Sequence, residues 1–384
     1  MLNKSAPKRV LHVFMNLNLG GAESRIMDLF RSQDVDVLIN DFVIMTSEPC
    51  YFADEVLSKG GKIHVIDSPR DGILKNLWQL YQLLRKKPQY TAIHAHTSYY
   101  SGLCVFIAFL AGISARITHA RNTSTGMNNL STRVMFSLGR TLSALFATSR
   151  FAISKDAGEF LYGPIPDGKK VNEGHFDVIA NAFDFRKVRH KQSAGDAEKL
   201  AYAIDAKILN IVSVGRFYPV KNHGFLLSII KDLSRERDDF CLHFIGDGEL
   251  KEQLQGEVQR LGLTPKVRFW GKRSDVDQLL SLFDVMVMTS LSEGLGVAAL
   301  EAQAAGLPCL LSMGIPQAAD IGVGLCQYLN LSASHGLWVN AIQQQALLPA
   351  VSKIDIDQQF EDRGYSLSAT RQRYLDAYLK HEKN

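Results

Sequence analysis

The chain has 384 residues, of which 46% are hydrophobic and 21% are charged. These values are typical of a globular protein with two domains and exclude a disordered or fibrous chain. The net charge of +4 is too small to indicate a nucleic-acid-binding protein, and the five cysteines are scattered without metal-ligand or redox spacing. We therefore expect two core-forming domains with their thiols in a reducing compartment.

The start of the chain contains basic residues but no long apolar segment. The apolar stretch that follows Arg9 is interrupted by Asn16 and Asn18, and no small-residue cleavage site follows, which does not suit a secretory signal. The most apolar run, 103–115, is shorter than the roughly 20 residues that cross a bilayer. We therefore expect a cytoplasmic protein.

Strand and helix patterns alternate through the first half of the chain. A short apolar strand at 10–14 leads through Gly20 and Gly21 into a helix at 22–31. Further strands are predicted at 35–45, 63–66, 91–94, 115–119, 147–153 and 177–179, with helices at 73–87 and from the fourth strand to residue 111. Such alternation indicates a parallel sheet covered on both faces by helices. Glycine between the first strand and its helix lets the backbone approach a ligand closely.

The stretch between Asp71 and Asp156 contains no acidic residue and ten basic ones. Within it, a candidate amphipathic helix at 128–146 places Arg133 and Arg140 on one face and apolar residues on another. Charge of one sign attracts phosphates or anionic lipid headgroups, so this helix is a candidate for resting on a membrane surface. The alternative is a core helix with a solvated stripe, whose charge is balanced by acids elsewhere in space.

The segment 184–206 is polar and charged, as a linker should be, and the alternation then restarts. Strands are predicted at 208–214, 241–245, 267–270, 284–289 and 309–312, with helices at 225–235, 250–260, 275–282, 297–305, 338–347 and 366–380. We predict an α/β protein with two facing, doubly wound, Rossmann-like domains at 1–183 and 207–365. A C-terminal helix at 366–384 is expected to pack back toward the first domain. Ligands of open α/β sheets bind outside the carboxyl ends of the strands, so we expect the binding site in a cleft between the domains.

The motif that carries the most chemistry spans residues 292–302, where a strand runs into a loop with two glycines and then into a helix. A helix that begins in this way offers free backbone N–H groups to an anion. Glu293 lies in the loop, and Glu301 follows eight positions later, inside the helix. Two carboxylates beside a phosphate site suit a sugar nucleotide, because they accept hydrogen bonds from sugar and ribose hydroxyls. The alternative is a helix with a favourable N-terminal acid and a solvated Glu301.

The run that starts with Glu293, with Glu301 in step, resembles the E-x7-E signature of the retaining family-4 glycosyltransferases, and the resemblance extends over nearly the whole chain. It is closest to the bacterial branch that builds surface polysaccharides. It implies the GT-B fold, with an N-terminal acceptor-side domain and a C-terminal nucleotide-sugar donor domain. It further implies that Glu293 contacts the donor sugar and Glu301 the ribose. The loop amides of Leu295, Gly296 and Val297 would lie against the sugar and the diphosphate.

Other motifs fit the same resemblance. Arg216 and Lys221 follow the first strand of the second domain and are similar to the family's G-R-x4-K element. Two fixed cations there can neutralise a departing diphosphate in place of a metal ion, whereas without the resemblance they would be surface residues beside a turn. Gly246 resembles the glycine turn that lies beside the nucleotide. Gly20 and Gly21 would face the donor diphosphate from the other domain.

Three histidines, His94, His96 and His119, are predicted at strand ends of the first domain. The segment around His119 resembles the family segment whose histidine faces the reacting sugar, where a neutral imidazole orients the sugar or stabilises developing positive charge. We expect His94 to be structural. The predicted catalytic residues are His119, Arg216, Lys221 and Glu293. The predicted acceptor or membrane face is His96, Arg133 and Arg140.

Some features depart from the family's pattern or carry no ligand. The element at 181–184, Asn-Ala-Phe-Asp, has alanine where the family has glycine, and we expect it to be architectural. After Pro308 the family's Gly-Gly pair and further glutamate are missing, so a donor contact from that loop is not carried over. No Asp-x-Asp pair is predicted at a strand end, and we therefore expect no metal and no other cofactor.

The expected activity is transfer of a hexose-type sugar, with retention, from a nucleotide-diphosphate sugar, foremost a UDP-sugar. The expected acceptor is a glycan or a polyprenyl-diphosphate-linked glycan in surface polysaccharide biosynthesis. The expected location is the cytoplasm, with peripheral contact at the inner face of the cell membrane, and no nucleic-acid partner is expected. Two alternatives stay open: a nucleotide-sugar 2-epimerase of the same fold, and a non-catalytic subunit that binds nucleotide sugars.

Overall fold

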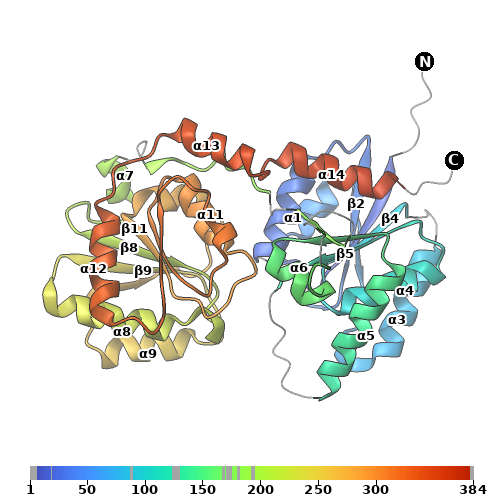
Figure 1. Cartoon of the computed structure of the whole chain (residues 1–384), viewed down its shortest axis with the longest axis horizontal. Helices are drawn as coiled ribbons and strands as arrows, with labels where there is room; N and C mark the ends of the chain where they lie inside the picture. The colour runs from blue at the N-terminus through green and yellow to red at the C-terminus, as the bar shows by residue number, and fades with distance from the viewer. Residues whose placement is uncertain are drawn as a thin grey trace. The chain divides into compact units, whose positions relative to one another are not determined.

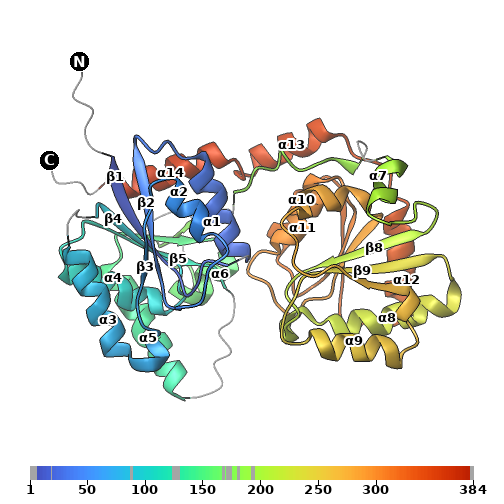
Figure 2. The ribbon, with the colours of Figure 1, turned by 180° about the vertical axis from the view of Figure 1, so that it is seen from behind.

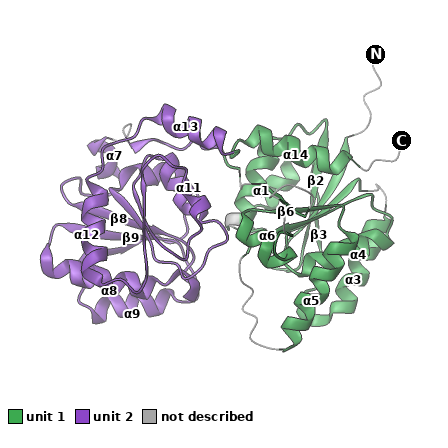
Figure 3. Ribbon diagram, in the orientation of Figure 1, with its two compact units in different colours: residues 1–183, 364–384 green, residues 184–363 purple. Residues whose placement is uncertain are grey.

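The computed structural model describes residues 7–18, 20–86, 90–122, 130–166, 169, 175–179, 182–191 and 195–380. The chain forms two compact units (Figure 3). Unit 1 comprises Met1–Phe183 and Gly364–Asn384, and unit 2 comprises Asp184–Arg363. Each unit has its own parallel sheet with helices around it (Figure 1).

Unit 1 is built on a seven-stranded sheet. In sheet order the strands are β3 (Ile63–Val65), β2 (Leu38–Ile44), β1 (Lys8–Val13), β4 (Ala92–Ala95), β5 (Ala115–Ala120), β6 (Ser149–Ala152) and β7 (Asp177–Val178). β1 pairs in parallel with both β2 and β4, so the strand order reverses beside β1. This is a doubly wound sheet, and its ligand end is the edge formed by the carboxyl ends of the strands.

Helices cover both faces of this sheet (Figures 1 and 2). They are α1 (Gly21–Ser32), α2 (Ala53–Ser58), α3 (Pro69–Arg85), α4 (Tyr100–Leu110), α5 (Leu130–Phe146), α6 (Lys155–Tyr162) and α14 (Leu367–Leu379). Because side chains of a strand alternate between faces, Val10 of β1 joins the core under α1 and α14, and Leu11 joins the core under α3 and α4. Tyr374 and Tyr378 of α14 belong to the first of these cores, so the C-terminal helix completes unit 1.

The two helices α4 and α5 cross at a pair of glycines. A Cβ atom on Gly102 would overlap the carbonyl group of Gly139, and a Cβ atom on Gly139 would overlap the carbonyl group of Tyr99. The backbones of the two helices are therefore in direct contact, and only glycine fits at these two positions. This crossing presses the Gly139 side of α5 directly against α4.

Unit 2 is built on a six-stranded sheet with the same winding. In sheet order the strands are β10 (Val267–Phe269), β9 (Phe240–Ile245), β8 (Leu209–Val214), β11 (Val285–Met288), β12 (Cys309–Ser312) and β13 (Cys326–Leu329). The α-helices are α7 (Asp196–Ala201), α8 (His223–Glu236), α9 (Lys251–Arg260), α10 (Val276–Leu279), α11 (Val297–Ala304), α12 (His335–Ala346) and α13 (Lys353–Asp362). The strand order again reverses beside the first strand of the unit, between β8 and β11.

The strands predicted from apolar runs are found with shifts of a few residues at their ends. The alternation did not predict the short helices α2 and α6, the helix α13 or the edge strand β13. The segment 184–206, expected to be a linker, contains α7 and belongs to unit 2 by its contacts. Among the described residues, no helix combines the length and apolar character that crossing a bilayer requires.

Candidate active site

The carboxyl ends of four neighbouring strands of unit 2 bring most of the predicted donor residues to one edge of the sheet. β8 ends before Gly215 and Arg216, and β9 ends before Gly246. β11 leads into the loop at 289–296, and β12 ends beside it. The edge therefore unites motifs that lie up to about 80 residues apart, as a doubly wound sheet requires.

Lys221 and Glu293 meet at this edge as an ion pair. The Nζ atom of Lys221 lies 2.5 Å from Oε1 of Glu293, and the hydroxyl of Ser290 donates to the same oxygen at 2.7 Å. Lys221 ends a short 3-10 turn, Pro219–Lys221, and Asn222 follows it in the left-handed region with φ 55°. The side chains of Lys221 and Glu293 are 21% and 15% exposed. The pair is thus partly shielded from water, where an electrostatic contact with a ligand is stronger than at an open surface.

The loop before α11 is shaped for a helix-terminus anion site. Gly296 stands at the N-cap of α11 with φ 81°, and a Cβ atom there would lie 2.8 Å from Cγ2 of Ile315. Only glycine suits this position, which turns the chain so that the first N–H groups of the helix, starting at Val297, are not used within the helix. The N–H of Glu293 donates to the carbonyl oxygen of Gly314 at 3.0 Å, which fixes the loop to the end of β12. Leu295 is buried, so it offers a ligand its backbone and not its side chain.

Glu301 and Arg216 lie at the margin of this group. Glu301 is partly buried and follows Gly296 by five positions, in the second turn of α11. Arg216 is exposed, and its guanidinium lies over the ring of Tyr218 at 5.2 Å from the ring centre. Within the described part of the chain, Arg216 forms no ion pair, so its charge is open to an anionic ligand.

Gly246 marks a close approach between two loops. Its φ is 149°, and a Cβ atom on it would overlap the carbonyl oxygen of Gly215. Its N–H donates to the carbonyl oxygen of Gly271 at 2.9 Å. The turns after β8 and β9 are therefore packed backbone to backbone, and the side chain of Lys221 lies beside Gly215 at the same point.

In unit 1, the turn between β1 and α1 contains the two predicted glycines. Gly20 is the N-cap of α1 and Gly21 its first residue. The carboxylate of Glu23 folds back over Gly20, where it would overlap a Cβ atom. This carboxylate also acts on Arg121, since its charge is one of the influences that raise the pKa of that guanidinium against the larger effect of burial. Arg121 was not predicted, although its place directly after β5 is a ligand-edge position.

The predicted histidines are part of a buried group of four. The group consists of His12 on β1, His94 on β4, His96 directly after β4, and His119 on β5. Burial is the first cause that lowers the pKa of each of them, to about 4 for His12 and well below the usual value of 6.5 for the other three. The rings are therefore neutral at physiological pH.

The structure buries His119 more deeply than its predicted role suggests. Its side chain is 0% exposed, and its Nδ1 atom lies 3.1 Å from Nε2 of His94. His96 is 9% exposed and accepts a hydrogen bond at Nδ1 from Nε of Arg121 at 3.0 Å. Arg121 therefore lies in direct contact with the predicted reactive histidines, and direct contact of His119 with an acceptor or a sugar stays a prediction.

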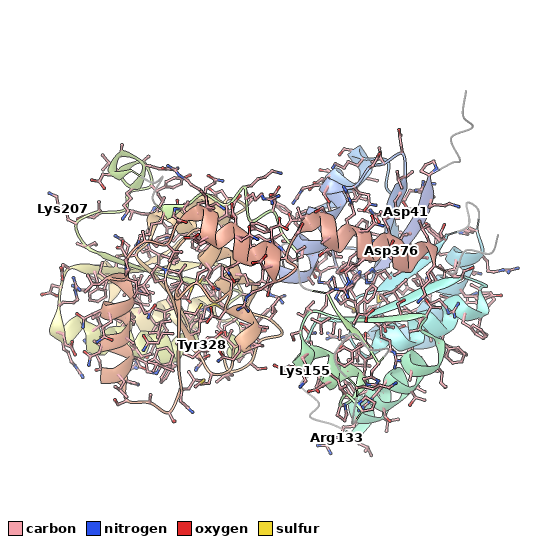
Figure 4. All side chains as sticks on the ribbon, turned by 45° about the horizontal axis from the view of Figure 1, so that its top comes forward. Asp41, Arg133, Lys155, Lys207, Tyr328 and Asp376 are labelled. Atoms are coloured by element: carbon pink, nitrogen blue, oxygen red, sulfur yellow. The ribbon has the colours of Figure 1, made fainter. Side chains whose placement is uncertain are left out.

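The two arginines of α5 have different surroundings. Arg133 is exposed near the N-terminal end of the helix (Figure 4). Arg140 is partly buried, and its guanidinium lies so close to Gly163, the C-cap of α6, that a Cβ atom there would overlap it. Arg140 is thus placed to stabilise the carboxyl end of α6, in addition to any contact that it makes with an anionic surface. Asn181, expected to be architectural, lies outside the described residues.

Comparisons with known proteins match both halves of the chain. A family model described as Glycosyl transferases group 1 matches residues 196–354. EpsF of Bacillus subtilis (strain 168), which is named as a glycosyltransferase, is 34% identical over 377 residues that cover 97% of each chain. An Escherichia coli protein named UDP-Gal:alpha-D-GlcNAc-diphosphoundecaprenol alpha-1,3-galactosyltransferase is 27% identical over 243 residues, 62% of each chain.

Solved structures with the same arrangement of elements include Alr3699/HepE of Anabaena in complex with UDP and glucose. It is 18% identical, with a TM-score of 0.77 over 97% of this chain and 100% of that chain. WaaG, a glycosyltransferase involved in lipopolysaccharide biosynthesis, is 13% identical, with a TM-score of 0.67 over 96% of this chain and 98% of its own. At such low identity these similarities show the fold alone.

Proposed function

Because the chain belongs to the group 1 glycosyltransferases and has the GT-B fold, we propose that it transfers a hexose-type sugar from a UDP-sugar with retention of the anomeric configuration. The acceptor that we propose is a glycan or a lipid-linked glycan of surface polysaccharide biosynthesis. The relatives support this choice of acceptor, since the name of the Escherichia coli protein specifies a diphosphoundecaprenol-linked acceptor.

One observation carries the proposal: cations, carboxylates and a helix N-terminus converge at the ligand edge of unit 2. A departing nucleoside diphosphate gains negative charge as the glycosidic bond breaks. Lys221 and Arg216 would stabilise that charge, and the N–H groups at the start of α11 would bind its oxygens. Glu293 would accept a hydrogen bond from a sugar hydroxyl, and Glu301 from the ribose.

We propose that the reaction needs no metal ion. Leaving-group charge is the quantity that a divalent ion would neutralise, and the two basic residues supply fixed positive charge for the same purpose. The ion pair between Lys221 and Glu293 holds Lys221 at the site with a defined geometry. Such pre-organisation lowers the cost of ordering the side chain when the donor binds.

We further propose that unit 1 touches an anionic membrane through α5. Leu130, Val134, Leu138 and Leu145 of α5 are between 43% and 77% exposed, although an apolar stripe is normally buried. Arg133 flanks this stripe, and the stretch from Asp71 to Asp156 is free of acidic residues. An exposed apolar stripe beside positive charge is the combination that binds a helix to an anionic lipid surface. The membrane would be the inner face of the cell membrane, where a polyprenyl-diphosphate acceptor is held.

The experiment that tests the proposed function is incubation of the purified chain with UDP-sugars, with and without a diphosphoundecaprenol-linked sugar acceptor, in the presence of EDTA. We expect acceptor-dependent release of UDP and a product whose new linkage has the donor's anomeric configuration by NMR. An inverted linkage, or activity lost with EDTA and restored by Mg²⁺ or Mn²⁺, would contradict the mechanism.

The same incubation separates the two alternatives. A nucleotide-sugar 2-epimerase would convert the donor to its C2 epimer without any acceptor. A non-catalytic subunit would bind the donor, as a rise in melting temperature, without releasing UDP. Arg216→Ala should abolish acceptor-dependent release, and Arg260→Ala, an exposed arginine of α9 paired with Glu257, should not.

A further inference from the structure

The four buried histidines of unit 1 raise the question of a metal site, because His12, His94 and His96 present ring nitrogens within 4.8 Å of one another. Arg121 argues against this interpretation. Its Nε–H donates to Nδ1 of His96 at 3.0 Å, and a guanidinium has no acceptor and does not lose its proton in proteins. A divalent cation bound by these rings would therefore stand directly beside a fixed positive charge.

The same contact determines where the hydrogens of one pair of rings lie. Since Nδ1 of His96 accepts from Arg121 and the ring is neutral, its hydrogen is on Nε2. Nε2 of His96 lies 3.1 Å from Nδ1 of His12 and donates to it. The hydrogen of His12 must then be on Nε2, which lies 3.0 Å from Oδ1 of Asn40, an obligatory acceptor. This chain of hydrogen bonds is consistent from Arg121 to Asn40.

The hydrogens of the other two rings, His94 and His119, can be placed in the same way, starting from Tyr378. The hydroxyl of Tyr378 lies 2.7 Å from Nδ1 of His94, and Nε2 of His94 lies 3.1 Å from Nδ1 of His119. Nη2 of Arg121 also approaches Nδ1 of His119, at 3.5 Å, and the hydroxyl of Tyr374 lies 3.4 Å from the same atom. Since a guanidinium only donates, Nδ1 of His119 is an acceptor, and the hydroxyl of Tyr374 can donate to it as well. His94 therefore donates from Nε2, accepts from Tyr378 at Nδ1, and leaves the hydrogen of His119 on Nε2.

We propose that Arg121 and Tyr378 lock all four histidines in the Nε2–H tautomer, and that Tyr378 of the C-terminal helix is thereby a positioning residue for His119. The Nε2 atom of His119 is fully buried and has no hydrogen-bond partner among the described residues. It is an N–H donor in this arrangement, so it suits an oxygen acceptor such as a hydroxyl or carbonyl group. Burying a donor without a partner is costly, which favours a ligand or water oxygen at this atom.

The direct test is NMR of the histidine rings in the full-length ¹⁵N-labelled chain, which distinguishes protonated from unprotonated ring nitrogens. We expect His12, His94, His96 and His119, assigned by single His→Gln variants, all to carry the hydrogen on Nε2. Tyr378→Phe removes the hydroxyl donor to His94. The ring signals of His94 and His119 should then shift toward those of a mixture of tautomers.

Tyr162→Phe is the matched control. Tyr162 is also a buried tyrosine of unit 1, but its hydroxyl donates to the Phe151 carbonyl oxygen at 2.9 Å and lies 3.1 Å from the hydroxyl of Thr118. This variant should leave all four ring patterns unchanged. A hydrogen on Nδ1 of His94 or His119 in the unmodified chain overturns the proposal, whether or not Tyr378→Phe folds. Unchanged signals in a folded Tyr378→Phe variant overturn it as well.

Zn²⁺ binding and steady-state kinetics separate the tautomer lock from a metal site and from the proposed catalytic role of His119. Stoichiometric binding of Zn²⁺ to the chelator-treated chain, abolished by His96→Gln, would overturn the proposal in favour of a metal site. The kinetic part rests on the proposed role of His119: Tyr378→Phe should lower kcat up to about tenfold with little change in the donor KM. Shifted ring signals with unchanged kcat would sustain the tautomer lock and refute only the link to catalysis.

Discussion

At the scale of single residues, one carboxylate oxygen of Glu293 accepts from both Lys221 and Ser290. A ligand hydroxyl that binds this oxygen must therefore compete with Ser290, which narrows the orientations in which a sugar can bind. Lys221 is also close enough to His223 to help lower the pKa of that ring to about 4, after the larger effect of burial. The positive charge beside Glu293 is thus carried by Lys221 and not by His223.

Lys221→Met should lower kcat by about 10²–10³, because it removes a cation that stabilises charge in the transition state. The fold should persist, with a small loss of stability from leaving Glu293 without its cation. Steady-state kinetics and circular dichroism measure both effects. Lys251→Met is the control, since Lys251 forms a more exposed pair with Asp247. Near-parental activity of a folded Lys221→Met variant would remove Lys221 from the proposed site.

Gly246 and Gly256 should respond oppositely to the same substitution. Gly246→Ala places a methyl group against the Gly215 carbonyl at a φ of 149°, so unit 2 should lose stability by an amount on the order of 1–3 kcal/mol. Gly256→Ala adds a methyl group in open space on α9 and should stabilise by about 0.5–1 kcal/mol. Denaturant unfolding monitored by circular dichroism gives both values. Equal effects would mean that the close approach after β8 and β9 does not exist.

The sequence placed the candidate donor residues at strand ends but did not predict their contacts. Lys221 and Glu293 are 72 positions apart, so only the sheet order, with β8 beside β11, brings them together. His12 and Arg121 were missed for a similar reason. A single histidine within an apolar strand carries no signal of its own, and its partners become visible only when neighbouring strands align it with His94 and His96.

At the scale of elements, α5 has two unlike faces. One is fixed to α4 through the contact of Gly102 with Gly139, and the opposite one leaves large apolar side chains in solvent. From the sequence, the apolar face of 128–146 fitted a core helix as well as a surface helix. The pattern gives the period of the helix but not the side that its neighbours occupy. The structure shows Val134, Leu138 and Leu145 on the exposed side.

Val134→Ser combined with Leu138→Ser should weaken binding to anionic liposomes at low salt, because it removes apolar area from the exposed stripe. Co-sedimentation with vesicles of phosphatidylglycerol and phosphatidylcholine measures this. Leu347→Ser, at a still more exposed leucine of unit 2, should leave binding unchanged. Arg133→Glu should weaken binding most at low salt, since a surface charge acts within a Debye length. If the unmodified chain ignores anionic vesicles, the stripe has another partner.

At the scale of the whole molecule, buried neutral histidines occur in both units. The pKa values of eight are lowered, chiefly by burial: His12, His64, His94, His96, His119, His190, His223 and His243. In the unfolded chain these rings bind protons near pH 6.5, whereas in the folded chain they do so only at lower pH. Proton uptake therefore favours the unfolded state as pH falls.

The free energy of unfolding should thus be largest above pH 6.5 and should fall steeply as pH decreases toward 4. For His12 alone, a folded pKa of about 4 against 6.5 corresponds to a loss of about 3 kcal/mol. Urea unfolding at pH values from 7.5 to 4.5 measures the trend. His12→Gln should reduce the slope. Stability that stays level between pH 6.5 and 5 would contradict the burial of neutral rings.

The two-domain architecture was predictable because the strand–helix alternation stops and restarts once, and each of the two runs forms its own sheet. The boundaries of the units were harder to predict. The segment 184–206 looked like a linker by composition, yet Lys191 and Lys199 reach Asp284 and attach this segment to unit 2. Polar composition predicts exposure to solvent, but it does not distinguish a free linker from a segment tied down by ion pairs.

Unit 1 consists of two segments that lie at opposite ends of the chain, Met1–Phe183 and Gly364–Asn384, and this determines the order in which its core can form during synthesis. Ribosomes synthesise a chain from its N-terminus, and domains generally fold as units as they emerge. The strands and helices of residues 7–179 leave the ribosome first, but the core under α1 lacks Tyr374 and Tyr378 until all of unit 2 has followed. Unit 2 can therefore finish folding before unit 1 does. The nascent first half must wait with part of its core uncovered, and it is the stage of synthesis at which chaperones have the most apolar surface to bind.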